Sequence, residues 1–179
     1  MKHLLLTLAL ALVAAPTSAQ TLAPLPDPKV PPVAETVSLA GPRFGFTSLS
    51  DGVVATLKDK NITVKNGIAQ FGWQFERQFY SKEGGPTVLN EWVVLVGGLD
   101  QGVVLPSVNW LVGLRTREGA EFGIGPNVTP AGVALTLAAG VTFRTGALNI
   151  PMTFAVVPSK DGMRISMLTG FTLRKPHGN

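Results

Sequence analysis

The feature that most constrains this chain is a two-residue alternation of apolar and polar side chains. It is clearest in residues 69–80, where Phe71, Trp73, Phe75 and Phe79 share one face, while glutamine, glycine and glutamate occupy the other. Successive side chains of a β-strand point to opposite faces, so this period predicts a strand with one apolar and one polar face. The 20 glycines and 14 prolines of the chain argue against a helical bundle.

The same period returns in segments that are separated by short connections rich in turn residues. We predict strands at residues 43–48, 69–80, 87–98, 103–116, 120–126, 131–144, 148–157 and 163–174. Strands joined this tightly must be antiparallel neighbours, because parallel pairs need a long crossover. Closure into a barrel removes exposed edges, and about eight strands is the smallest common size of a closed membrane barrel. The predicted fold class is all-β: an antiparallel, up-and-down, closed β-barrel of transmembrane type.

Residues 50–66 fit two structures. Ser50 can cap a short helix that has Val53 and Leu57 on one side. The Asp-Gly and Asn-Gly dipeptides near the two ends of this stretch are also good hairpin turns, which would add strands. We favour the helix.

Alternation alone does not say which face is inside, but the composition of the two faces favours an apolar exterior. Charged residues make up 15% of the chain, whereas about 25% is usual for a soluble domain. The polar faces are dominated by Gly, Ala, Thr, Ser and Gln rather than by Lys and Glu. We therefore expect an aromatic, lipid-facing band. Its candidate members are Phe71, Trp73, Phe75, Phe79, Trp110, Phe143 and Phe171.

Charged residues on the polar faces would then lie in a narrow lumen. An unpaired buried charge costs several kcal/mol, so both signs are required there. The candidate lumenal network consists of Glu76, Arg115, Glu121, Arg144, Arg164 and Arg174.

The N-terminus predicts export. A short basic start precedes an apolar run at residues 4–15, and a small-x-small pattern ends at Ala19, which together are typical of a cleaved signal peptide over residues 1–19. Residues 20–42 form a Pro-rich tether that favours extended, unpaired backbone. The barrel domain is expected at residues 43–175, followed by a tail at 176–179.

Three stretches carry a resemblance to a known class of protein. QFGWQFERQF (residues 70–79), EFGIGPN (121–127) and PAGVALTLAAGVTFR (130–144) resemble segments of the small eight-stranded outer-membrane barrels of diderm bacteria, of an uncharacterised type. The resemblance covers roughly residues 43–175 and implies a barrel in the outer membrane, with no activity attached. The chain departs from the pattern in two places. Its last strand runs into Arg174 and Lys175 instead of ending on an aromatic residue, and Pro151 lies inside a strand, where it demands a bulge or a shorter strand.

The sequence offers little chemistry. Cysteine is absent, and the two histidines, His3 and His177, lie in the signal peptide and the tail, so a histidine-based triad or metal site in the barrel is disfavoured. Glu76, Glu91 and Glu121 are conceivable catalytic carboxylates, although pairing with arginine explains buried carboxylates better. We expect no catalytic residue, cofactor or metal. The scattered basic residues argue against nucleic acid as a partner.

Three functions stay open at this point. The first is an outer-membrane barrel with a structural role in the cell envelope, in contact with membrane lipid and with other envelope components. The second is a periplasmic or secreted, lipocalin-like barrel that holds an apolar ligand. The third is an outer-membrane enzyme that modifies lipid, which the shortage of histidine disfavours.

Overall fold

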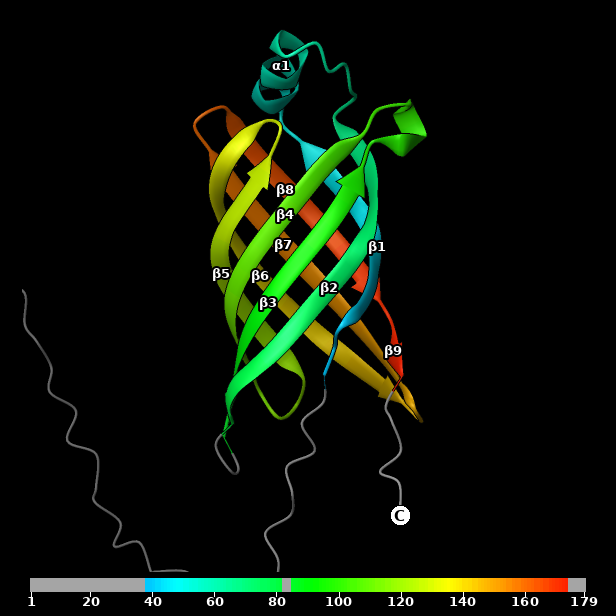
Figure 1. The fold of residues 1–179 in the computed structure, drawn as a ribbon, viewed down its shortest axis with the longest axis vertical. Coiled ribbons are helices and arrows are strands. Elements are labelled where there is room, and N and C mark those ends of the chain that lie inside the picture. The colour runs from blue at the N-terminus through cyan, green and yellow to red at the C-terminus, as the bar shows by residue number, and fades with distance from the viewer. Residues whose placement is uncertain (1–37, 82–84, 174–179) are drawn as a thin grey trace, which may run out of the picture. The chain divides into compact units, whose positions relative to one another are not determined.

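The structure is a computed structural model that describes residues 38–81 and 85–173 of the 179-residue chain. These residues form a closed β-barrel with one short helix across its upper end (Figure 1). The strands are β1 (Gly41–Leu49), β2 (Gly67–Ser81), β3 (Thr87–Gly97), β4 (Leu105–Arg115), β5 (Ala120–Thr129), β6 (Gly132–Thr145), β7 (Leu148–Ser159), β8 (Gly162–Gly170) and β9 (Thr172–Leu173). The predicted signal peptide, most of the predicted tether, and the tail with Arg174 lie outside the described residues.

Every pairing in the barrel is antiparallel, and strands that follow one another in the sequence are hydrogen-bonded neighbours. The ring closes where β1 pairs with β8, with Arg43 opposite Gly170 and Leu49 opposite Arg164. The predicted antiparallel closed barrel of eight strands is confirmed.

One predicted strand end is wrong for a physical reason. The Asn-Val-Thr-Pro sequence at residues 127–130 was expected to be a turn, but β5 continues to Thr129 and the turn occupies residues 130–131. Asn127 is buried, and its side-chain amide donates hydrogen bonds to Ser107 and Asn109 at 2.9 Å each. An asparagine that bonds to side chains of the adjacent strand β4 stabilises the strand instead of the turn. At the other end of the chain, β1 begins at Gly41, two residues before the predicted boundary.

Pro151 neither bulges nor shortens β7, contrary to the prediction. The β6–β7 register runs through it without a shift, with Thr142 opposite Pro151. The pairing is interrupted instead between β7 and the last strand, because proline has no N–H to donate. Pairing of β7 stops at Met152–Thr169 and resumes, in the same register, at Asn149–Thr172, so the last strand is split into β8 and β9.

Residues 50–66 contain the favoured helix, α1 (Asp51–Asp59). Val53 and Leu57 are buried on one of its sides, as the spacing predicts. Ser50 is the N-cap residue, but its hydroxyl makes no capping bond and instead accepts a hydrogen bond from the Met163 backbone N–H at 3.0 Å. This bond ties the start of the helix to the start of β8. Among the described residues, no helix is long and apolar enough to cross a membrane.

Candidate functional site: the outer wall and the lumen

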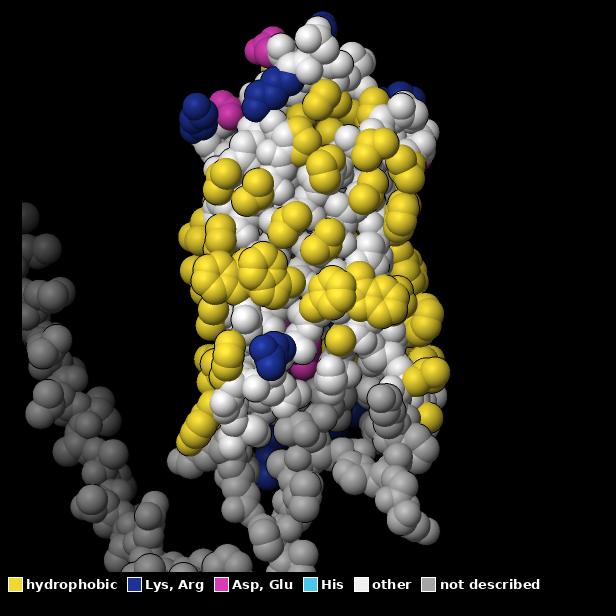
Figure 2. Space-filling view, viewed as in Figure 1, with side chains coloured by type: hydrophobic (Ala, Val, Ile, Leu, Met, Phe, Trp, Pro, Cys, Tyr) yellow, Lys and Arg dark blue, Asp and Glu magenta, His cyan; other side chains and the backbone are white. Residues whose placement is uncertain are grey.

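The outer wall of the barrel is apolar. All seven aromatic side chains predicted to face lipid are at least 44% exposed to the surroundings. Figure 2 shows hydrophobic side chains spread over the wall, whereas many of the charged side chains on this face gather at the α1 end. The wall also exposes aromatics outside the predicted set: Phe44, Phe46, Tyr80, Trp92, Phe122 and Phe154.

Two of the exposed tryptophans form a pair on neighbouring strands. Trp92 of β3 lies opposite Trp110 of β4, and their rings stack with centroids 5.9 Å apart. The Trp110 indole N–H donates to the Asn90 side-chain oxygen at 2.6 Å, so its polar group is satisfied on the surface. Trp92 was missing from the predicted set because β3 is apolar on both faces. Its inward Val93 and Leu95 hide the alternation.

The lumen contains most of the buried polar side chains. Three of them form a hydrogen-bonded chain in which the side chains of Asn127 and Thr136 both donate to the Asn109 side-chain oxygen, at 2.9 and 3.0 Å. In a second group, the Thr47 hydroxyl bonds to Gln70 at 2.6 Å and to Ser166 at 2.7 Å. Side chains therefore occupy much of the interior and many of them bond to one another, as a barrel of about eight strands permits.

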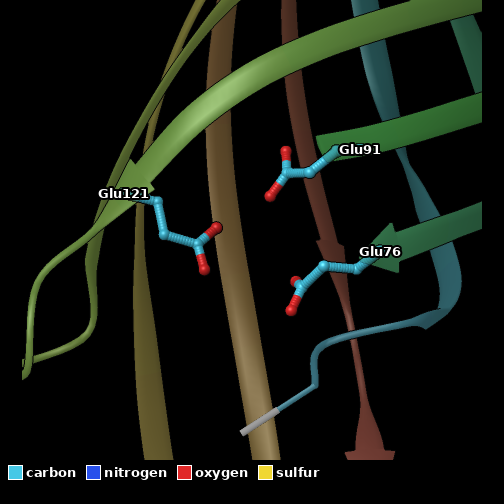
Figure 3. A group of neighbouring side chains, drawn as sticks. All are labelled: Glu76, Glu91 and Glu121. Carbon is cyan, nitrogen blue, oxygen red and sulfur yellow. The ribbon is translucent and has the colours of Figure 1, made fainter. Parts of the chain in front are cut away.

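An ion cluster lies in the half of the lumen away from α1. Arg115 of β4 pairs with Glu76 of β2 through both carboxylate oxygens, and with Glu121 of β5. All three side chains are largely buried. Figure 3 shows that Glu76, Glu91 and Glu121 project into the lumen from three different strands.

Neighbouring charges explain why the cluster needs arginine. Glu76 lies directly opposite Glu91 on the adjacent strand, an arrangement of like charges that destabilises a sheet. One carboxylate oxygen from each of the three glutamates lies within 4.8 Å of the others. Arg115 and Arg43 attract these carboxylates. The Arg43 guanidinium is held by Gln74 at 3.0 Å and by two backbone carbonyls, so it stays close to the cluster.

The structure brings three of the predicted network residues together, namely Glu76, Arg115 and Glu121. Arg144 is exposed near the end of β6. Arg164 is buried near the α1 end, where it donates to the Thr129 hydroxyl. Arg174 lies outside the described residues. The alternation of β1 contains the signal for Arg43, because Arg43 and Thr47 share the face opposite Phe44 and Phe46.

The α1 end of the lumen is closed by an apolar plug. Val53 and Leu57 of α1 pack into a buried cluster with Leu49, Val64, Ile68 and Leu105. Further inside, Val93, Leu95, Leu111 and Leu168 form a second apolar layer, so the inner face is not polar throughout. The remaining internal cavity is about 80 Å³.

No family model matches the chain, and neither a curated protein nor a solved structure matches it.

Proposed function

We propose that this chain is an outer-membrane β-barrel with a structural role in the cell envelope. The observation that carries the proposal is the distribution of side chains: bulky aromatic and aliphatic groups cover the outside, while the buried glutamine, asparagine, threonine, arginine and glutamate side chains share the inside with two apolar layers. In water such an exterior would be costly, because each exposed Å² of apolar surface forgoes roughly 25 cal/mol. In hydrocarbon the same exterior is favourable.

The strand lengths support the proposal. A tilted strand needs about 9–11 residues to cross the hydrocarbon core. Here β1 has 9 residues, β3 and β4 have 11 each, and β5 has 10. In the described residues each of the strands β1 to β8 has a hydrogen-bonded neighbour on both sides, as lipid requires of a spanning sheet.

The connections suggest an orientation. The longest connection, residues 50–66 with α1, lies at one end, and the two-residue turn at 146–147 lies at the other end, beside the start of β1. Outer-membrane barrels have short periplasmic turns and longer extracellular loops. We therefore place α1 on the extracellular side and residue 38 on the periplasmic side.

The interior favours a structural role over transport or ligand storage. A soluble carrier of an apolar ligand needs its aromatic side chains inside, whereas here the phenylalanines and tryptophans of the described strands are exposed on the outer wall. Ligand pockets usually measure about 300–1,000 Å³, and the internal cavity of about 80 Å³ is far smaller. Residues 41–173 contain no His or Cys, and two of the three lumenal glutamates bind Arg115. We propose that the barrel carries no catalytic activity.

The test is to locate the folded protein in cells. We expect an outer-membrane band that needs detergent for extraction and that migrates faster on a gel before boiling than after, because a closed barrel stays compact in mild detergent. A folded monomer in the soluble fraction, with its tryptophans shielded from aqueous quenchers, would overturn the proposal.

A further inference from the structure

Three arginines are buried in the barrel, and one of them differs from the other two. Arg115 bonds to Glu76 and Glu121, and Arg43 bonds to a glutamine and to two backbone carbonyls. Arg164 is 6% exposed, yet no carboxylate in the described residues pairs with it. Its one hydrogen bond goes from Nη1 to the Thr129 hydroxyl, and its Nε is buried without a partner.

An unpaired buried guanidinium is costly, so its position matters. Removing a charge from water costs several kcal/mol unless hydrogen bonds and an opposite charge replace the water. Arg164 lies on β8 between Leu49 of β1 and Val157 of β7, neither of which offers a polar side chain. The folded chain therefore holds a cation whose natural partner, an anion, is missing from the described residues.

Arg164 also lines a groove of about 570 Å³ at the α1 end. The groove is bounded by α1, by the start of β6 and by the β7–β8 turn, and its volume is in the range of small-molecule sites. Two lysines line it as well: Lys60, after α1, and Lys160, in the β7–β8 turn. Asp161 is the one acidic residue among its lining residues, so two positive charges stay uncompensated.

We propose that this groove is a binding site for a phosphate group, with Arg164 as its floor and with Lys60 and Lys160 at its sides. A phosphate monoester carries about −1.5 to −2 charges at neutral pH. This charge matches the two excess positive charges of the groove better than the single charge of a carboxylate does. The phosphate oxygens accept hydrogen bonds from a guanidinium in a planar, two-pronged geometry. The positive groups of Arg164, Lys60 and Lys160 are therefore the donors that the site offers.

The phosphate can belong to a lipid headgroup or to a dissolved solute. The inference does not depend on the proposed membrane location, because the groove and its charges exist in either case. If the barrel is in a membrane, the α1 end lies beyond the apolar wall, at the level where headgroup phosphates are found.

The experiment follows the Arg164 Nε–H resonance by NMR in the full chain, folded in a nonionic detergent that contains no phosphate. One titration uses inorganic phosphate, and the other uses phosphatidic acid added to the micelles. We expect the resonance, assigned by its loss in Arg164→Lys, to shift with saturation. Saturation by inorganic phosphate identifies a site for a free phosphate compound, and saturation by the lipid alone identifies a headgroup site. A resonance that stays unchanged in both titrations would overturn the proposal.

Charge variants separate a built site from general attraction. The double variant Lys60→Gln with Lys160→Gln should weaken the binding by roughly tenfold or more, because it removes two of the three positive charges that line the groove. Lys58→Gln is the matched control, since Lys58 lies in the last turn of α1, two residues before Lys60, but does not line the groove. If Lys58→Gln weakened phosphate binding as much as Lys60→Gln alone or Lys160→Gln alone, the attraction would be non-specific, and this result would contradict the site. These variants change exposed residues, so the test holds even if Arg164→Lys fails to fold.

Discussion

An arginine on the outer wall at mid-height tests whether hydrocarbon surrounds the barrel. Ile124 is half exposed, and its partners on the two adjacent strands, Val112 and Leu137, are exposed to a similar degree. It lies five residues before the end of β5 at Thr129. At about 3.3 Å per residue and a strand tilt of about 45°, that is roughly 12 Å along the barrel axis. The apolar band of such barrels is about 25 Å tall, so Ile124 lies near its middle.

The substitution Ile124→Arg should therefore lower the free energy of unfolding by about 2–4 kcal/mol in a lipid bilayer. Val133→Arg is the matched control. Val133 is also on the outer wall and is 71% exposed, but it is the second residue of β6 and lies close to the end of the barrel. The same arginine there should cost only about 0–1 kcal/mol.

The assay is equilibrium unfolding by denaturant in phospholipid vesicles, followed by tryptophan fluorescence. The expected signature is the difference between the two variants, because it depends on depth alone. On a surface in water, both substitutions would fall within about 0.5 kcal/mol of the parent. Equal costs at the two heights would refute the lipid-facing wall.

Three further predictions test the interior and the packing of the strands. Arg115→Met leaves Glu76 and Glu121 without their cation and should lower the free energy of unfolding by about 3–5 kcal/mol in denaturant. Adding Glu76→Gln and Glu121→Gln to this variant should restore most of the loss. An unchanged stability of Arg115→Met would show that the ion pairs contribute nothing. Gly125→Ala places a methyl group against a backbone carbonyl oxygen of β4 and should cost about 1–3 kcal/mol in the same assay, whereas Gly67→Ala meets no atom within 4 Å and should be close to neutral; equal effects would contradict the packing. The barrel inserted in a planar bilayer should show no lasting conductance, because the α1 plug and the Arg115 cluster fill the lumen, and a stable open level would disprove the closure.

Alternation and turn spacing were sufficient to predict the barrel. The period of two in β2, β4 and β6 fixes which side chains share a face, and the short connections fix the antiparallel order. The helix at residues 51–59 was also predictable from the spacing of Val53 and Leu57. These are local properties, which one stretch of sequence contains in full.

The height of a residue along the barrel axis was not predictable in the same way. Arg115 and Arg164 both face inward, yet one joins the glutamates and the other lies near the opposite end. The strands are tilted and staggered, so their relative heights depend on register around the whole ring. Charge sign and face alone do not determine which inward charges meet.

The inner apolar layer shows a second limit. Val93 and Leu95 face inward on β3 while Trp92 and Val94 face outward, so the strand shows a run of apolar residues. Such a run hides its own period, and the inward and outward residues are separated only by their cross-strand partners.

The seam between β1 and β8 sets the order of events in folding. It joins residues near position 44 with residues near position 169, so the ring cannot close until almost the entire polypeptide has been synthesised. Pairings of such long range form slowly. Until they form, two strand edges and the apolar outer wall are accessible to other chains and can aggregate. Any truncation that removes β8 would therefore yield an aggregating sheet in place of a smaller barrel.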